Sequence, residues 1–426
     1  MIAFIRIPSG LSDPILYHSY GGGIAAGDGY RSLVGDPTAY YPPGYPYFLG
    51  GLYKLADLVG LDSHLDLVVG MSQSLLWAVA AVAVALTGRW AFEGPAGRRV
   101  GLVAGLVLAC WPNLVTYAAA WLSESLFVAL FAVAIAALTA CARRRPPEPV
   151  AVLPLVLAAA CISTATMVRP QVLLGMPLVA LAWLLGGLGW RRVLALTAAV
   201  TIALAALVVP WMMRNSAQMG EAVPISTNGG DNLCIGFHPD APGSFKLPIE
   251  YCDTGESWGD GFEAELRRNS ETRDRAIEHI LDEPLSLPRL SARKLFYTFR
   301  SDDDGLAGGE SYGADTVLTS PWRGAWLTFA HTAYAVVMVA AVAGLVLAAR
   351  MWWRDRGRAE LGALLGLALA GICVPVLFFG DPRFKVPTTP LFALFAAVAA
   401  VSLAHRLQKR SGATGVDAGD WESTSR

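Results

Sequence analysis

Long apolar runs, each about the length of a membrane-spanning helix, occupy most of this chain and restrict what it can fold into. A helix needs about 20 apolar residues to cross a membrane, because each residue adds about 1.5 Å and the hydrocarbon layer is about 30 Å thick. Nine runs meet this requirement: 65–88, 99–117, 123–142, 150–168, 171–188, 193–212, 323–350, 359–380 and 384–405. Charged residues make up only 16% of the chain, against about 25% in a soluble domain. The sequence therefore predicts an all-α polytopic membrane protein with nine transmembrane helices.

Arginine and lysine residues are shared unequally between the connections of these runs. One set of connections holds fifteen of them: Arg89, Arg98, Arg99, Arg143, Arg144, Arg145, Arg191, Arg192, Arg350, Arg354, Arg356, Arg358, Arg406, Lys409 and Arg410. The alternate connections hold three, which are Arg169, Arg383 and Lys385. Because positive charges mark the cytoplasmic face, we expect an integral, multi-pass protein of the plasma membrane with a cytoplasmic C-terminus and an active face outside.

The predicted spans divide the chain into five parts. They are an outer loop (1–64), six transmembrane helices (65–212), an outer-face domain (213–322), three transmembrane helices (323–405) and a cytoplasmic tail (406–426). The tail is expected to be disordered, because from Ser411 it is small, polar and rich in glycine. Nine spans and an inner C-terminus place the N-terminus outside. We therefore expect a tenth, N-terminal span upstream of this sequence, with residues 1–8 as the end of its helix.

Both outer segments contain helix signals. Asp13-Pro14 is a strong helix start, and it predicts a short helix over 15–26. An amphipathic helix is predicted over 47–58, after a proline-rich turn, and both helices are expected to lie along the membrane interface. Two further helices are predicted in the outer-face domain, over 262–281 and 289–299, the second docking on the membrane.

Several short motifs lie in the polar connections along most of the chain. They are Asp13 with Tyr17-His18, Ala25-Ala26-Gly27-Asp28-Gly29-Tyr30, Pro37-Thr38-Ala39-Tyr40-Tyr41-Pro42-Pro43-Gly44-Tyr45-Pro46, Leu122-Ser123-Glu124-Ser125-Leu126-Phe127, Arg169-Pro170, Ser226-Thr227-Asn228-Gly229-Gly230, and Gly380-Asp381-Pro382-Arg383-Phe384-Lys385-Val386-Pro387. With these motifs the chain resembles the GT-C type membrane glycosyltransferases, of the branch that includes protein O-mannosyltransferases and the lipid A aminoarabinose transferase.

The resemblance implies a polyprenyl-phosphate sugar donor, an acceptor on the outer face and inversion at the anomeric carbon. It also implies a span just before the catalytic aspartate. Many members carry two acidic residues at that position, whereas Ser12-Asp13-Pro14 offers one carboxylate. A divalent metal is therefore compatible with the resemblance but not supported by the sequence, and no cofactor follows with certainty.

Asp13 is the candidate general base for the acceptor hydroxyl, because it is acidic, on the outer side and at a helix start. The alternative is that it only caps the helix. Arg383 and Lys385 are the candidates for binding the donor phosphate, and Arg169 is a third. Their alternative role is anchoring at the interface, where long basic side chains reach toward the headgroups.

Supporting roles are expected for Glu124, Asp381, Tyr17 and His18. Glu124 could equally be a first-turn acid that interacts with the helix dipole, and Asp381 is expected to orient Arg383. Three tyrosines could stack on a sugar or acceptor, although an aromatic belt at the interface is the favoured interpretation: Tyr40, Tyr41 and Tyr45. His18 and His238 have no companion at metal-ligand spacing, so no metal site is predicted.

Two cysteines, Cys234 and Cys252, lie in the predicted outer-face domain. That side of a bacterial membrane is oxidising, so a disulfide between them is predicted, the alternative being two free thiols.

Three functions remain open from the sequence. The preferred one is a glycosyltransferase whose partners are a polyprenyl-phosphate sugar, membrane lipid and an acceptor of unknown type. The second is a transporter or lipid flippase, which would usually show two related halves and interrupted midplane helices. The third is a scaffold without chemistry. The net charge of −1 gives no basis for a nucleic-acid partner.

Overall fold

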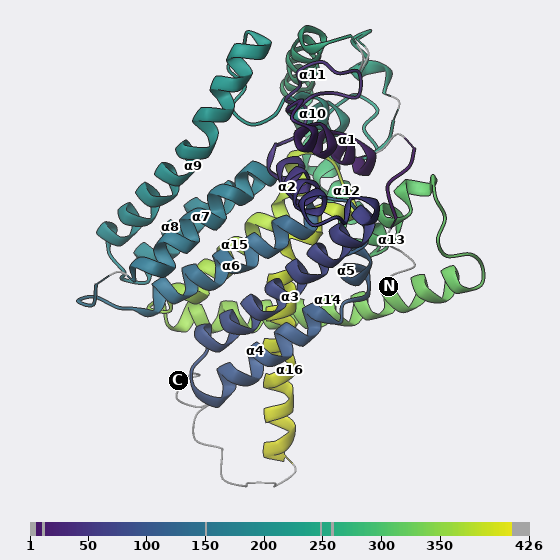
Figure 1. Ribbon diagram of the computed structural model, residues 1–426. Helices are drawn as coiled ribbons and strands as arrows, with labels where there is room; N and C mark the ends of the chain where they lie inside the picture. The colour runs from purple at the N-terminus through teal and green to yellow at the C-terminus, as the bar shows by residue number, and fades with distance from the viewer. Residues whose placement is uncertain (1–5, 11–12, 150, 248, 257–259, 411–426) are drawn as a thin grey trace.

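The structure, a computed structural model, describes residues 6–10, 13–149, 151–247, 249–256 and 260–410. It is a bundle of long helices with a cap of shorter helices at one end (Figure 1). The bundle helices are α3 (Leu65–Ala91), α4 (Gly94–Ala109), α6 (Glu124–Arg143), α7 (Val152–Val168), α8 (Met176–Leu185), α9 (Trp190–Met219), α14 (Trp322–Arg354), α15 (Ala359–Leu377) and α16 (Thr389–Arg410). The cap contains the N-terminal helices and the polar segment that follows α9.

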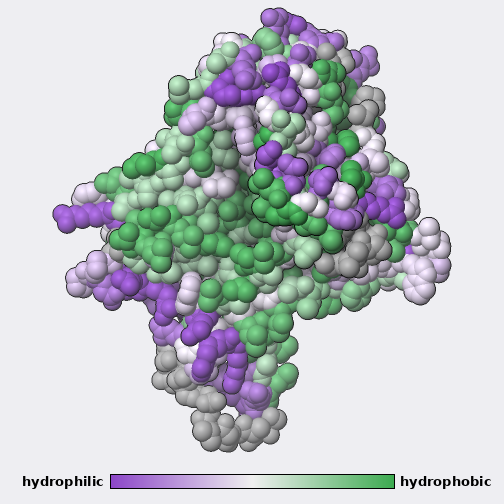
Figure 2. Space-filling view, in the orientation of Figure 1, coloured by the Kyte–Doolittle hydropathy of each residue, from purple (hydrophilic) through white to green (hydrophobic). Residues whose placement is uncertain are grey.

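Six helices in the described part of the chain are long and apolar enough to cross a membrane, and they include α3, α6, α9, α14, α15 and α16. Two shorter apolar helices span Val152–Val168 and Pro170–Leu185. Apolar residues form a broad band over the bundle, with polar residues gathered above and below it (Figure 2). The prediction of an all-α polytopic membrane protein is confirmed, whereas the count of nine full spans is not.

A proline interrupts one of the predicted spans. In the run 99–117, helix α4 ends at Ala109, and Pro112 begins a separate short helix, α5 (Pro112–Tyr117). The prediction of one continuous helix over 99–117 is therefore wrong. A second proline, Pro170, directly precedes the run 171–188: Arg169 is extended, as a residue before proline favours, a 3-10 helix runs from Pro170 to Gly175, and α8 continues it to Leu185.

The first outer loop contains the two helices expected there, α1 (Asp13–Ala26) and α2 (Gly44–Leu58). They pack directly on each other, and glycines permit the approach. A Cβ on Gly21 would lie 2.8 Å from the Cβ of Leu49, and one on Gly50 would lie 2.6 Å from a methyl of Ile24. Of the expected N-terminal helix end at 1–8, residues 1–5 lie outside the described part, and 6–8 form no helix.

The polar segment after α9 forms four helices of the cap: α10 (Gly229–Gly236), α11 (Phe262–Asp282), α12 (Leu287–Phe299) and α13 (Asp304–Gly309). The predicted helices 262–281 and 289–299 correspond to α11 and α12. A disulfide joins Cys234 to Cys252, and Cys234 is buried in a small apolar cluster with Phe237, Ala276 and Leu290. In the predicted tail, residues 406–410 continue α16, and 411–426 lie outside the described residues.

Candidate active site

Four charged side chains from distant parts of the chain meet at the cap end of the bundle. Arg383 lies in the 3-10 helix η7 (Pro382–Thr388), which links α15 to α16. Its Nη1 is 2.5 Å from Oδ2 of Asp13, and its Nε is 2.8 Å from Oε1 of Glu124. The same Glu124 oxygen accepts a hydrogen bond from Nη2 of Arg169 at 2.5 Å. We call these four residues the charged cluster.

Each member is placed by the end of a helix. Asp13 is the first residue of α1, Glu124 is the first residue of α6, and Arg169 directly follows α7. Asp381 caps η7, because its Oδ1 accepts a hydrogen bond from the backbone amide of Arg383 at 2.9 Å. Asp381 therefore acts on Arg383 through the backbone turn.

Asp13 is the most accessible member, with 29% of its side chain exposed. Its Oδ1 accepts a hydrogen bond from the Tyr41 hydroxyl at 2.6 Å. Burial opposes ionisation of this carboxyl, but the Arg383 charge and the Tyr41 hydrogen bond outweigh burial and hold its pKa below the usual range. The two oxygens of Asp13 thus bond to side chains of the site.

Glu124 is fully buried and holds both arginines. Its Oε1 is shared by the two guanidinium groups, and Arg169 also donates from Nε to the hydroxyl of Ser123 at 3.0 Å. Within the described residues, Oε2 of Glu124 has no hydrogen-bond partner. Removing a buried ion's partner costs far more than breaking a surface pair, so Glu124 and its arginines must be considered as one unit.

Asp304, at the start of α13, belongs to the same site and was not predicted. Its Oδ2 lies 4.0 Å from Nε of Arg383 and 2.5 Å from the Tyr117 hydroxyl. Burial, together with the nearby carboxylate of Asp381, raises the pKa of Asp304 to about 8. This carboxyl therefore holds its proton at neutral pH. The acidic run 302–304 in the outer segment was the available sequence signal.

Lys385 lies apart from the charged cluster, although it is only two residues from Arg383. Its side chain is fully buried, and its Nζ is 3.2 Å from Oδ1 of Asp302 and 2.6 Å from the carbonyl oxygen of Ser301. Asp302 also accepts hydrogen bonds from Trp111 and Asn113. These contacts tie η7 to the segment before α13, and they differ from the phosphate-binding role predicted for Lys385.

The tyrosines of the first outer loop are packed inside the cap. Tyr17 lies between Tyr41 and Tyr45, with ring centroids 4.8 and 5.0 Å away. The Tyr45 hydroxyl bonds to the side chain of Gln73, and the Tyr40 hydroxyl bonds to Asp231. The aromatic-belt interpretation is wrong for Tyr41 and Tyr45, because both rings are buried in protein.

His18 is half-buried, and its Nδ1 is 3.0 Å from the Tyr53 hydroxyl. Burial lowers its pKa. In the part of the chain that the structure describes, no group of three or more histidine, cysteine or acidic side chains could hold a metal ion.

No protein-family model matches the sequence, and no curated protein matches it. The fold is similar to that of solved membrane oligosaccharyltransferases, in agreement with the resemblance that the motifs indicated. Among solved structures, the Archaeoglobus fulgidus oligosaccharyltransferase tethered to an acceptor peptide matches with a TM-score of 0.56 and 14% identity, covering 96% of this chain and 47% of that one.

The same organism's oligosaccharyltransferase AglB, in complex with an inhibitory peptide and a dolichol-phosphate, matches with a TM-score of 0.51 and 17% identity, covering 99% of this chain and 50% of that one. ArnT from Cupriavidus metallidurans bound to undecaprenyl phosphate gives a TM-score of 0.42 and 12% identity, with coverages of 97% and 78%. The chain thus spans about half the length of the oligosaccharyltransferases that it matches.

Proposed function

We propose that this protein is a membrane glycosyltransferase that transfers a sugar from a polyprenyl-phosphate-linked donor to an acceptor at the outer face of the membrane, with inversion at the anomeric carbon. The ion pair between Asp13 and Arg383 carries the proposal, because a partly exposed carboxylate beside a guanidinium can serve both partners of such a reaction. The carboxylate takes a proton from the acceptor, and the guanidinium binds the donor phosphate.

Asp13 is the general base in this proposal. An acceptor hydroxyl attacks the anomeric carbon, the new oxygen–carbon bond forms, and the hydroxyl proton passes to Asp13. The bond between the anomeric carbon and the phosphate oxygen breaks with its electron pair, which releases polyprenyl phosphate. Tyr41 keeps Oδ1 oriented, so Oδ2 is the oxygen that meets the acceptor once Arg383 has turned toward the phosphate.

Arg383 and Arg169 hold the donor phosphate in this proposal. Their side chains are 16% and 14% exposed, so both can reach a ligand while Glu124 holds them in place from the buried side. A phosphate competes with Asp13 for Arg383. When Arg383 turns to the phosphate, Asp13 loses the charge that lowers its pKa and becomes a stronger base. Donor binding thereby activates the base.

The remaining predicted residues act by positioning. Asp381 shapes the turn of Arg383, and Lys385 fixes η7 against Asp302. Asp304, holding its proton, does not add a third negative charge next to the phosphate. The solved AglB complex with a dolichol-phosphate supports a lipid-phosphate donor or product for this fold.

A transporter or lipid flippase is the alternative. Carriers place their ionisable groups near the membrane midplane, in interrupted helices. Here the charged cluster is built from helix ends, as the positions of Glu124 at the start of α6 and of Arg169 after α7 show. This placement suits a reaction at the membrane surface.

The test is release of polyprenyl phosphate by the purified protein in detergent. A panel of polyprenyl-phosphate sugars labelled in the lipid would be supplied with glycan, lipid and peptide acceptors. We expect release that Asp13→Asn lowers by about 10²–10⁴-fold. Asp28→Asn, which changes an exposed acid of the same loop, should leave release intact. Movement of intact donor across a vesicle membrane without release would support the flippase instead.

A further inference from the structure

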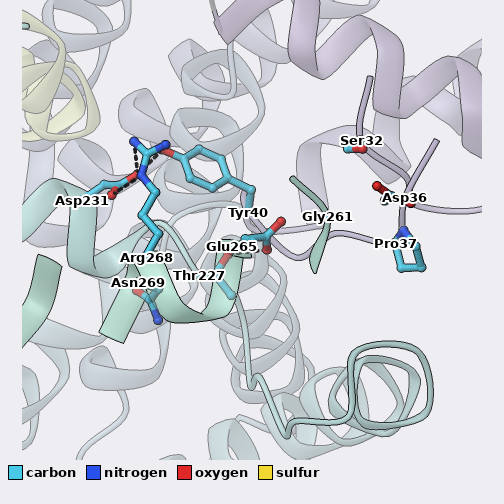
Figure 3. Close-up of a pocket in the computed structure, with 10 residues that line it drawn as sticks. All are labelled: Ser32, Asp36, Pro37, Tyr40, Thr227, Asp231, Gly261, Glu265, Arg268 and Asn269. Atoms are coloured by element: carbon cyan, nitrogen blue, oxygen red, sulfur yellow. Dashed lines mark hydrogen bonds and ion pairs between the residues drawn. The ribbon is translucent and has the colours of Figure 1, made fainter. Parts of the chain in front are cut away.

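A group of polar side chains at the cap joins the first outer loop to α10 and α11 (Figure 3). Tyr40 approaches from the loop, Asp231 from α10, and Glu265 and Arg268 from α11. The cavity between them measures about 30 Å³, which is room for one or two water molecules. A sugar ring does not fit there, so this group is a joint between segments of the chain.

Glu265 forms the centre of the joint. Its Oε2 accepts a hydrogen bond from the Thr38 hydroxyl at 2.5 Å, and its Oε1 accepts two more, from the Ala39 backbone amide at 3.0 Å and from the Thr227 hydroxyl at 2.5 Å. The Ala39 carbonyl in turn accepts from the Thr227 amide at 3.0 Å. One carboxylate thus fastens residues 38 and 39 of the loop to α11 and to the segment before α10.

A second contact holds the next residue of the loop. The Tyr40 hydroxyl donates to Oδ2 of Asp231 at 2.8 Å, and Arg268 binds both oxygens of Asp231 at 3.0 Å. Charge-assisted bonds of this kind are about twice as strong as neutral ones. Three consecutive loop residues are therefore anchored to the domain that follows α9.

The residue directly after this anchored stretch is Tyr41, whose hydroxyl is 2.6 Å from Oδ1 of Asp13. The backbone carbonyl of Tyr41 accepts a hydrogen bond from the buried Tyr30 hydroxyl at 2.9 Å. Hydrogen bonds and the loop backbone therefore connect α11 to Oδ1 of Asp13, whereas Arg383 contacts Oδ2 of the same carboxylate.

We propose that Glu265 is a positioning residue that holds the Tyr41 hydroxyl on Asp13. Through this contact, the polar segment after α9 sets the orientation and basicity of the Asp13 carboxylate. The inference rests on the proposed function in assigning Asp13 the role of base. The hydrogen bonds of the joint can be tested without an activity assay.

The consequence is a change in the titration of Asp13. Hydrogen bonds donated to a carboxylate favour its charged form and lower its pKa. Glu265→Ala leaves Thr38, Ala39 and Thr227 without their shared acceptor, the loop loosens, and the Tyr41 bond is weakened. The pKa of Asp13 then rises, because the hydrogen bond that favours its charged form is weakened. Tyr41→Phe removes the final bond directly and should give a shift of the same sign.

The experiment is a double-mutant cycle read by difference infrared spectroscopy, which follows the Asp13 carboxylate band against Asp13→Asn as the blank. Glu265→Ala, Tyr41→Phe and the double variant would be titrated in the full-length protein. If Glu265 acts through Tyr41, the double variant shifts no more than Tyr41→Phe alone. Additive shifts, or no shift with Glu265→Ala, would overturn the inference.

Matched variants separate positioning from general loss of structure. Glu263→Ala changes an exposed acid on the same turn of α11 and should leave the titration unchanged. Glu265→Gln keeps one acceptor oxygen for Ala39 and Thr227 and should recover most of the wild-type pKa. A shift equal to that of the alanine variant would contradict the assigned contacts.

The pH–rate profile of sugar transfer gives the link to function. A base must be deprotonated, so its activity is lost as pH falls through its pKa, and a raised pKa moves this acid limb to higher pH. One outcome is that the variants show the expected non-additive shifts in the Asp13 titration while the wild-type protein transfers no sugar. That outcome would refute the proposed function and leave the coupling of Glu265 to Asp13 standing. Transfer with an acid limb that Glu265→Ala does not move would refute only the joint.

Discussion

The guanidinium of Arg383 lies 2.5 Å from the carboxylate of Asp13, although 370 residues separate them in the chain. The ion pair joins the start of α1 to η7, the turn that precedes the last helix, α16. Each group would be costly to hold partly buried and charged by itself. Together they are stable, yet either can be released when a ligand of the right charge arrives.

Asp13→Asn tests the base. The amide keeps the size and polarity of the side chain but accepts no proton, so turnover should fall by about 10²–10⁴-fold. Donor affinity should stay the same or increase, since Glu124 still orients Arg383 and the phosphate no longer competes with the Asp13 charge for it. The measurement is single-turnover transfer together with equilibrium donor binding. Wild-type turnover in Asp13→Asn would remove the central claim of the proposal.

Arg383→Ala tests the phosphate site. Arg383 is expected to hold the phosphate in both ground and transition states, so donor binding should weaken and chemistry should also slow. Arg383→Lys should rescue only partly, because an ammonium lacks the two-pronged geometry of the guanidinium. Arg289→Ala, at an exposed position of α12, is the control. Unchanged affinity in Arg383→Ala, with only a lower melting temperature, would indicate a purely structural role.

Asp304→Asn tests the buried protonated carboxyl. The pKa of Asp304 is about 8 in the folded protein, against 3.8 ordinarily. At a pH between these two values, unfolding therefore releases the proton of Asp304. The contribution of Asp304 to stability is therefore lost progressively as pH rises from about 4 to about 8. Asp304→Asn should flatten this dependence and raise the melting temperature at pH 8 relative to wild type. An unchanged pH dependence, compared with Asp303→Asn as the control, would contradict the raised pKa.

The disulfide between Cys234 and Cys252 can be checked chemically. Its sequence separation of 18 residues corresponds to a stabilisation of about 3 kcal/mol in the chain-entropy model. Alkylation of the unfolded, unreduced protein should modify the four free cysteines, Cys110, Cys141, Cys161 and Cys373, and spare the pair. Mass spectrometry that finds both Cys234 and Cys252 alkylated would rule the bond out.

Sidedness follows from the distribution of arginine and lysine. A reporter fused after Lys409 should lie in the cytoplasm, and one inserted near Asp260 should lie outside. The physical reason is the retention of positive connections on the cytoplasmic side during insertion. Both reporters on one side of the membrane would overturn the topology and the outer-face assignment of the site.

Sequence reasoning identified Asp13, Glu124, Arg169 and Arg383 as candidates, but not that they meet. The signals were local: an acid at a helix start, and cations on the side where cations are rare. Asp304 was missed because its raised pKa arises from burial beside Asp381 and Arg383, which are far away in the chain. Lys385 was given the role of its neighbour Arg383, whereas the turn of η7 directs it to Asp302.

That the chain forms apolar helices with charges at their ends follows from the sequence alone, because helix formation in a membrane depends on the length and polarity of one continuous segment. The folded structure was needed to see which helix ends lie together, which carboxylates share Arg383, and which of them keeps its proton. Those outcomes depend on packing between segments up to 370 residues apart, and no local pattern encodes them.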